Sequence, residues 1–101
     1  MTSLPNSMGS LSHLSLLTLH NNKISQIPRT FTGLTNLIYL GLSNNKLTSL
    51  PSNIGEISSL LRLFINGNLL TSLPNSIGDL TNLDLLYVDN NYLTSLPSTM
   101  I

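Results

Sequence analysis

The sequence has no cysteine and no tryptophan, and only 8% of its 101 residues are charged. Without cysteine there can be neither a disulfide framework nor a thiolate metal site. The charges cancel to a formal net charge of zero, which removes the attraction that nucleic acid or an anionic membrane surface usually requires. Nucleic acid is therefore not an expected partner.

Long hydrophobic runs and targeting signals are also missing. No stretch approaches the roughly 18 consecutive apolar residues of a membrane span, and the first ten residues lack the basic and apolar regions of a secretory signal. No Asn-x-Ser/Thr acceptor for glycosylation occurs, although asparagine is abundant. Together these absences predict a cytoplasmic protein that is not inserted in a membrane.

What the sequence does contain is a repeat of 23 residues, which is clearest at the prolines Pro5, Pro28, Pro51, Pro74 and Pro97. No linker or change in composition divides the chain, so we expect one continuous array over residues 1–101. The expected units are a partial repeat at 1–13, full repeats at 14–36, 37–59 and 60–82, and a truncated repeat at 83–101.

Apolar and other residues alternate in the first third of each repeat, which predicts a short strand of about five residues. In the second full repeat, Leu40 and Leu42 would face the core, and Tyr39, Gly41 and Ser43 would face the opposite side. A single strand this short is unstable. Stacked in parallel on its equivalents, it buries its leucines and completes its hydrogen bonds, so stability must come from the array.

The second half of each repeat carries an apolar residue three positions after the proline and another three positions further on. This spacing predicts one tight helical or 3₁₀ turn that faces the core. Proline lacks an N–H group and has a fixed φ, so it suits the entry to that turn. The first set of apolar residues is Met8, Phe31, Ile54, Ile77 and Met100.

The full pattern, L-x-x-L-x-L-x-x-N-x-L-x-x-L-P, resembles the leucine-rich repeat family over essentially the whole chain. The resemblance implies an α/β repeat solenoid: a horseshoe segment with short parallel strands on the concave face, and turns, 3₁₀ or short helical segments on the convex face. The wording "LTSLPxxIGxLTNL" is similar to the intracellular Ras-binding and Scribble-like scaffold group. This similarity implies a protein-interaction module of a larger signalling or scaffold protein, with a small GTPase or another signalling protein as the expected partner.

An asparagine occupies the ninth place of every repeat: Asn22, Asn45, Asn68 and Asn91. The family carries an inward-facing ladder of side-chain amides at this place. A buried amide must find hydrogen-bond partners, and backbone groups of the adjoining turn can supply them. We therefore expect a structural role for these four residues. The asparagines just before them are expected to be solvent-facing turn residues.

The seventh place brings His20, Ser43, Asn66 and Asp89 into one column and raises the question of a catalytic triad. Neighbouring strands lie about 4.8 Å apart, which places Asp89 roughly 14 Å from His20. A carboxylate at that distance cannot orient the imidazole. We therefore expect a polar surface column, no enzyme activity in this segment, and neither a metal ion nor another cofactor.

Aromatic residues at places that the leucine pattern does not need are the strongest functional indication. Phe64 and Tyr87 should lie side by side on the concave sheet, with Tyr39 and Arg62 one column away. Tyrosine and arginine often anchor protein interfaces, although stacked aromatics can also simply stabilise a sheet. The predicted partner-binding residues are Tyr39, Arg62, Phe64, Leu85, Tyr87, His20 and Asp89.

Two other functions remain open at this stage. The segment could serve as the recognition part of a leucine-rich-repeat kinase or GTPase whose catalytic domain lies elsewhere, or it could be a truncated structural array without a partner. The sequence starts at the eleventh place of a repeat and stops within another, with no polar cap at either end. We expect a fragment of a longer array, or self-association through uncapped ends.

Overall fold

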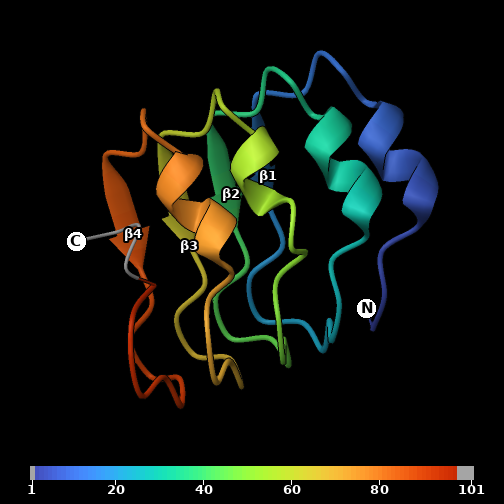
Figure 1. Ribbon diagram of the computed structural model, residues 1–101. Helices are drawn as coiled ribbons and strands as arrows, with labels where there is room; N and C mark the ends of the chain where they lie inside the picture. The colour runs from blue at the N-terminus through green and yellow to red at the C-terminus, as the bar shows by residue number, and fades with distance from the viewer. Residues whose placement is uncertain (1, 98–101) are drawn as a thin grey trace.

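The computed structural model describes residues 2–97. The expectations that concern Met1, Met100 and the end of the last repeat lie outside the described residues. The described chain measures 34 × 29 × 19 Å along its principal axes. One layer is a parallel sheet and the other is a row of short helices (Figure 1).

The sheet has four parallel strands in sequence order, β1 (Leu16–Thr18), β2 (Tyr39–Gly41), β3 (Arg62–Phe64) and β4 (Leu85–Tyr87). Every strand pairs with the next at a step of 23 residues, so equivalent places form straight columns. The strands are shorter than the alternation predicts, with three residues each. The pairing continues beyond them nevertheless, and the N–H group of Asn44 donates to the carbonyl of Asn66 at 2.9 Å.

The return segments form the 3₁₀ helices η1 (Asn6–Ser10), η2 (Arg29–Gly33), η3 (Ile54–Glu56) and η4 (Asn75–Asp79). Figure 1 is seen from the side of these helices, with the strands behind them. We call the helical side the convex face and the opposite side of the sheet the concave face. The predicted solenoid of parallel strands and 3₁₀ turns is confirmed.

Proline begins the helical turns as its chemistry suggests. Pro28 stands directly before η2 in extended backbone, with φ −66° and ψ 144°, and its carbonyl accepts a hydrogen bond from Phe31 at 3.0 Å. Pro51 likewise accepts from Ile54 at 3.0 Å, but η3 starts only at that residue. Since proline fixes φ and has no N–H group to satisfy, it leads into the turn without losing a donor.

The core lies between the sheet and the helices. Leu40, Leu63, Phe31 and Ile54 have no exposed surface, so strand leucines and helical residues meet in one apolar layer. The equivalent leucine of the first full repeat, Leu17, is only partly buried. Burial is greatest in the middle of the array because a repeat there is covered by a neighbour on both sides.

Candidate functional site

The asparagines of the ninth place join neighbouring repeats beneath the concave face. The Oδ1 atom of Asn68 accepts a hydrogen bond from the Leu47 N–H group at 3.0 Å, and its Nδ2 donates to Leu42 at 3.0 Å and Ile65 at 2.9 Å. The side chain is 3% exposed. These hydrogen bonds of the Asn68 side chain all go to backbone groups, so its role is structural. The same pattern recurs at Asn45 and Asn91.

The residue before each of these asparagines has a left-handed backbone. Asn21, Asn44 and Asn90 have φ values of 61°, 59° and 57°, and Gly67 has 71°. Asparagine and glycine are the residues that adopt this conformation most readily. The three asparagines are exposed, as turn residues should be. In the first full repeat, the Nδ2 atom of Asn22 donates to the carbonyls of Leu19 and His20.

The concave face is formed by the third, fifth and seventh places of four successive repeats. Strand alternation turns these side chains away from the core. Because the strands are in register, each place gives one column across the sheet. The columns are Leu16, Tyr39, Arg62 and Leu85; Thr18, Gly41, Phe64 and Tyr87; and His20, Ser43, Asn66 and Asp89.

Three aromatic rings form a contiguous cluster at the centre of this face. The ring centroid of Phe64 lies 4.9 Å from that of Tyr39 and 5.0 Å from that of Tyr87, the latter in an edge-to-face arrangement at 80°. These separations are typical of attractive aromatic pairs. Tyr39 and Phe64 are half-buried by the contacts, whereas Tyr87 is 46% exposed. The cluster therefore presents a fixed apolar surface with polar hydroxyl groups.

His20 extends the aromatic cluster because Gly41 has no side chain. A Cβ atom at Gly41 would lie 2.5 Å from Nε2 of His20, so any other residue would displace the imidazole. The ring approaches Phe64 edge-on at 6.4 Å. Gly41 was not among the residues predicted from the sequence. It could have been found as the one position without a side chain in a column that otherwise carries Thr18, Phe64 and Tyr87.

The hydrogen bonds of the seventh-place column differ from those of a catalytic triad. The Nδ1 atom of His20 accepts a hydrogen bond from the backbone N–H of Ser43 at 3.0 Å. The hydroxyl of Ser43 donates to Oδ1 of Asn66 at 2.6 Å, and the carboxylate of Asp89 accepts from Asn90 at 3.4 Å. The imidazole thus holds a main-chain group and does not activate the hydroxyl.

Arg62 and Leu85 flank the cluster in the first column. Tyr39 pairs with Arg62, and Arg62 with Leu85, across the sheet. Arg62 is exposed and Leu85 is half-buried. The structure therefore brings five of the predicted residues together around the rings and places His20 at one border of the cluster. Asp89, exposed at the end of the third column, is not part of any aromatic contact.

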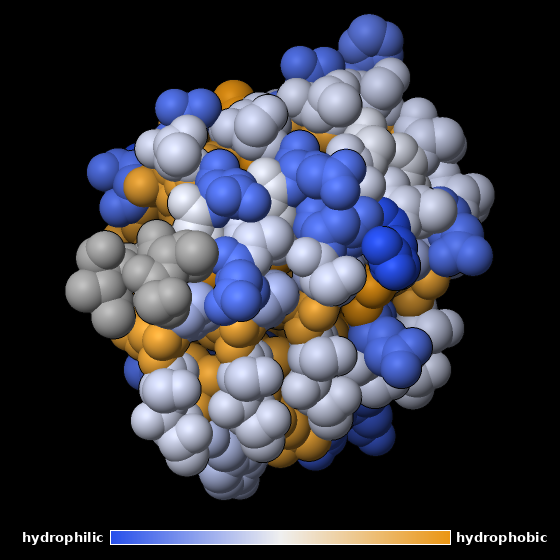
Figure 2. All heavy atoms as spheres, viewed as in Figure 1, coloured by the Kyte–Doolittle hydropathy of each residue, from blue (hydrophilic) through white to orange (hydrophobic). Residues whose placement is uncertain are grey.

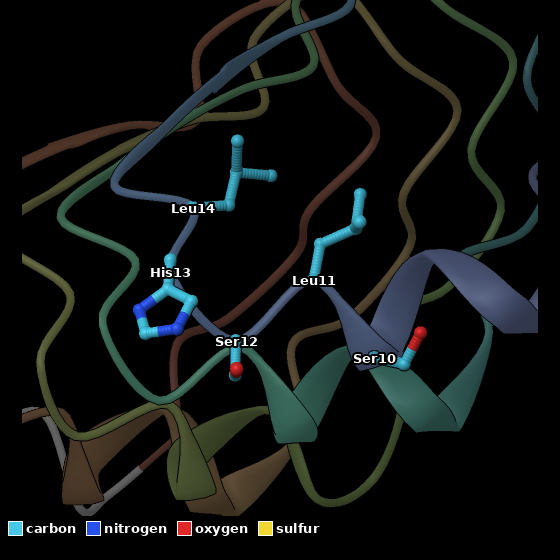
Figure 3. A pocket seen from close by; sticks show the side chains of 5 residues that line it. All are labelled: Ser10, Leu11, Ser12, His13 and Leu14. Atoms are coloured by element: carbon cyan, nitrogen blue, oxygen red, sulfur yellow. The ribbon is translucent and has the colours of Figure 1, made fainter.

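A shallow hollow of about 430 Å³ lies beside the segment between η1 and β1 (Figure 3). One continuous stretch lines it, and Leu11 and Leu14 project to the same side of that stretch. Leu11 is 49% exposed. His13 also lines the hollow, but no group of three metal-ligating side chains occurs within residues 2–97. A hollow lined by one segment has no convergent polar groups to orient a ligand.

The convex face differs from the concave one in its side chains. Figure 2 shows mostly hydrophilic and weakly polar residues over the helices, with hydrophobic residues visible mainly in the gaps between the rows. No helix of the described chain is long and apolar enough to cross a membrane. The aromatic cluster of the concave face is the better candidate for a recognition surface.

Comparison with known proteins agrees with this architecture. The family model for leucine rich repeats matches residues 2–47. A leucine-rich-repeat protein of Leptospira interrogans has 43% sequence identity over 92% of the chain, with a TM-score of 0.90. The chain belongs to the leucine-rich repeat family. No curated protein sequence matches it.

Two plant receptors are also similar. The peptide hormone receptor RGFR1, solved in complex with RGF2, has 32% identity over 97% of the chain and a TM-score of 0.89. The ectodomain of the receptor kinase GASSHO1/SCHENGEN3 from Arabidopsis thaliana, solved with CASPARIAN STRIP INTEGRITY FACTOR 2, has 32% identity over 91% and a TM-score of 0.84. The chain spans only 24% of the Leptospira protein and 16% and 12% of the two receptors.

Proposed function

We propose that this chain is a protein-binding module that recognises its partner on the concave face. The aromatic cluster of Tyr39, Phe64 and Tyr87 carries the proposal, because these rings occupy places that the core does not need. Rigid aromatic side chains provide a large contact area and lose little conformational entropy on binding. Similar solved structures that include receptors with bound peptide factors support this function.

The backbone beneath the rings supports recognition without rearrangement. Parallel pairing and the asparagine ladder hold the strands in register from β1 to β4. A surface fixed in this way need not be ordered by its partner, which lowers the cost of association. The rings also contact one another across strands, so the same cluster stabilises the sheet. The two roles are compatible, and a binding measurement separates them.

Selection of phage-displayed random peptides on the immobilised chain, followed by measurement of the selected peptides on variants, tests the proposal. In the double variant Phe64→Ser/Tyr87→Ser we expect affinity to fall at least about tenfold, because the central apolar contact is removed. The far-UV CD spectrum should stay close to that of the parent. Undiminished affinity in the folded double variant would contradict the site.

Tyr92→Ser is the matched control for this experiment. Tyr92 is 65% exposed and lies outside the three columns of the concave face. Its replacement removes an exposed aromatic ring of the same kind without touching the cluster. We therefore expect the selected peptides to bind this variant as they bind the parent chain.

A narrower form of the proposal concerns the partner and the compartment. The resemblance to intracellular scaffold repeats supports a role in signalling, a small GTPase or other signalling protein as partner, and a cytoplasmic location. Titration with a purified Ras-type GTPase in its two nucleotide states tests the partner, and imaging of a tagged chain tests the location. Absence of GTPase binding would limit the proposal to the general protein-binding function.

The similarity to the ectodomain of a receptor kinase favours a second candidate, the recognition segment of an enzyme whose catalytic domain lies elsewhere. The genomic sequence on both sides of this reading frame tests it, since a kinase or GTPase domain should be encoded there. A structural array without a partner is the third candidate, and a selection that yields no peptide would favour it. Self-association also stays a prediction, which light scattering at several concentrations tests.

A further inference from the structure

We propose that the concave face binds a peptide segment that carries a carboxylate opposite Arg62 and an apolar side chain next to it. The carboxylate would pair with the guanidinium group, and the apolar side chain would lie on Phe64 and Tyr87. This inference rests on the protein-binding function proposed above and specifies the chemistry of the partner.

Arg62 is the first observation. It is the first residue of β3, faces away from the core and is exposed. Within residues 2–97 its guanidinium group forms neither an ion pair nor a hydrogen bond with another side chain. Arginine has five N–H donors in a planar fork that matches a carboxylate with two parallel hydrogen bonds. These donors are directed to a ligand or to water.

The surroundings of Arg62 make such a pair stronger than an ordinary surface contact. Tyr39 and Leu85 are its partners on the two neighbouring strands, and Phe64 and Tyr87 form the adjoining column. A peptide that covers these apolar side chains would exclude water from the guanidinium group. A charged pair gains strength as the local dielectric falls, provided that its hydrogen bonds are complete.

The other charges of the concave face fix where the carboxylate can bind. Asp89, four residues after Leu85, is the only other formally charged residue in the three columns, and it repels an acidic group. Nδ1 of His20 already accepts a hydrogen bond from the Ser43 N–H group, so it does not donate to a carboxylate. Asp84 stands next to Leu85 in the chain and is exposed, but no ion pair joins it to Arg62.

The charge balance also favours a carboxylate over a phosphate group. A phosphate monoester carries about −1.5 to −2 charges at neutral pH and is usually bound by a cluster of arginines. The three columns offer one guanidinium group and, at the opposite border, one carboxylate. A single negative charge beside Arg62 is therefore the better complement.

Peptide selection on the parent chain tests this inference directly. We expect the selected sequences to share an aspartate or glutamate with an apolar residue close to it. A selected peptide is then synthesised with an amidated C-terminus, so that the side chain of its acidic residue is its only carboxylate. Changing that residue to its amide should weaken binding to the parent at least about tenfold, since the charged hydrogen bonds to Arg62 are lost.

The variant Arg62→Gln should bind the acidic peptide and its amide form equally, because the interaction is already lost. Arg29→Gln is the matched control, since Arg29 is an exposed arginine that begins η2 on the convex face. This control should distinguish the two peptides as the parent does. If both arginine variants lost the preference for the acidic peptide over its amide form, the effect would come from net charge in general. That result would overturn the assignment to Arg62.

The remaining outcomes separate this inference from the proposed function. Peptides that require Phe64 and Tyr87 but no acidic residue would overturn the carboxylate site and leave the protein-binding function intact. Peptides that bind the Phe64→Ser/Tyr87→Ser variant normally would contradict both proposals. Repeated selection without any binder would also count against both.

Discussion

The two faces of the array join neighbouring repeats in different ways. Beneath the concave face the connections are the same at the three junctions that Asn45, Asn68 and Asn91 span. Between the first and second full repeats, for example, Oδ1 of Asn45 accepts from the Ile24 N–H at 3.1 Å and Nδ2 donates to Leu19 at 3.0 Å. Ile24 is fully buried, so its N–H group has no access to water and requires this acceptor.

On the convex face, two types of side-chain donor bridge adjacent repeats at some junctions. The hydroxyl of Thr30 donates to the Asn6 carbonyl at 2.9 Å, and the hydroxyl of Ser76 donates to Ser52 at 2.7 Å. These donors occupy the same place in their repeats. A second bridge, from the last asparagine of a repeat, forms at the same junctions: Asn36 to Ser12 and Asn82 to Ser58.

The junction between the first and second full repeats lacks both convex bridges. Asn53 and Ser59 stand at the two donor places there. The hydroxyl of Ser59 donates at 2.6 Å to Leu37 of its own repeat, and Thr32 donates at 3.1 Å to the Arg29 carbonyl that the first bridge would use. Oδ1 of Asn53 is buried without a hydrogen-bond partner.

The glycines of the helices also distinguish the η2–η3 junction from its neighbours. In η1 a methyl group at Gly9 would collide with the Thr30 carbonyl of the next repeat, and in η3 one at Gly55 would collide with the Ser76 carbonyl. The equivalent residue of η2 is Thr32. Figure 1 shows η1 beside η2 and η3 beside η4, with a wider separation between η2 and η3. A side chain at this place prevents the close approach that glycine allows.

The two faces differ in what the loss of one bond between repeats costs. The concave bonds satisfy buried backbone groups, so losing one leaves an unsatisfied donor or acceptor that costs about 1–3 kcal/mol. The convex bridges are exposed and can be replaced by water. The array therefore keeps one face continuous and tolerates a seam on the other, between η2 and η3.

The largest expected effect comes from breaking the continuous face at this junction. Asn45→Ala leaves the Ile24 N–H group buried without an acceptor and removes two donors from buried carbonyls. We expect a loss of about 3 kcal/mol in the free energy of unfolding, measured by urea denaturation. Asn53→Ala, on the convex side of the same junction, should change stability by less than about 0.5 kcal/mol. Equal losses would contradict the contrast between the faces.

A smaller loss of stability should follow when the close contact between η3 and η4 is disrupted. In Gly55→Ala, the new methyl group meets a backbone carbonyl that cannot move aside easily. We expect a loss of about 1–3 kcal/mol, seen as a lower Tm. Thr32→Ala at the equivalent place removes only one exposed hydroxyl bond and should cost less. Replacing glycine by alanine where space allows raises the Tm, because the unfolded chain becomes less flexible. A higher Tm for Gly55→Ala would therefore contradict the close packing.

The smallest effect should come from repairing the existing seam. Asn53→Ser removes the buried, unpartnered Oδ1 and supplies a hydroxyl like that of Ser76, which can donate to the Arg29 carbonyl. We expect a gain of about 0.5–1 kcal/mol in thermal or urea denaturation. The reverse change, Ser76→Asn, should cost a similar amount by opening the next junction. A loss in both variants would show that the seam is not set by this residue.

Much of the fold could be read from the sequence because the repeat reports the same environment several times. Leu40 and Leu42 were expected in the core from alternation, and both are fully buried. The 3₁₀ turns were expected from apolar spacing after each proline and are confirmed. The columns of the concave face follow from the 23-residue step, since a parallel sheet in register aligns equivalent places.

Other features needed the neighbouring repeats in place. Gly41 has a low propensity for strands, yet its lack of a side chain leaves room for the His20 ring from the preceding repeat. Thr32, Asn53 and Ser59 are visible as departures from the repeat, but the pattern does not tell which carbonyl each will bond. Such choices depend on distances between repeats, which local periodicity does not encode.

The repeat length, the buried face of each strand and the place of the asparagine ladder can be predicted from the sequence alone. These follow from periodicity and from the need to satisfy buried polar groups. The tertiary structure adds that the Tyr39 ring contacts Phe64 beside the expected Phe64–Tyr87 pair. It also leaves Arg62 without a side-chain partner among the described residues and interrupts the convex face between η2 and η3. Those outcomes depend on how side chains of adjacent repeats compete for the same space and the same carbonyls.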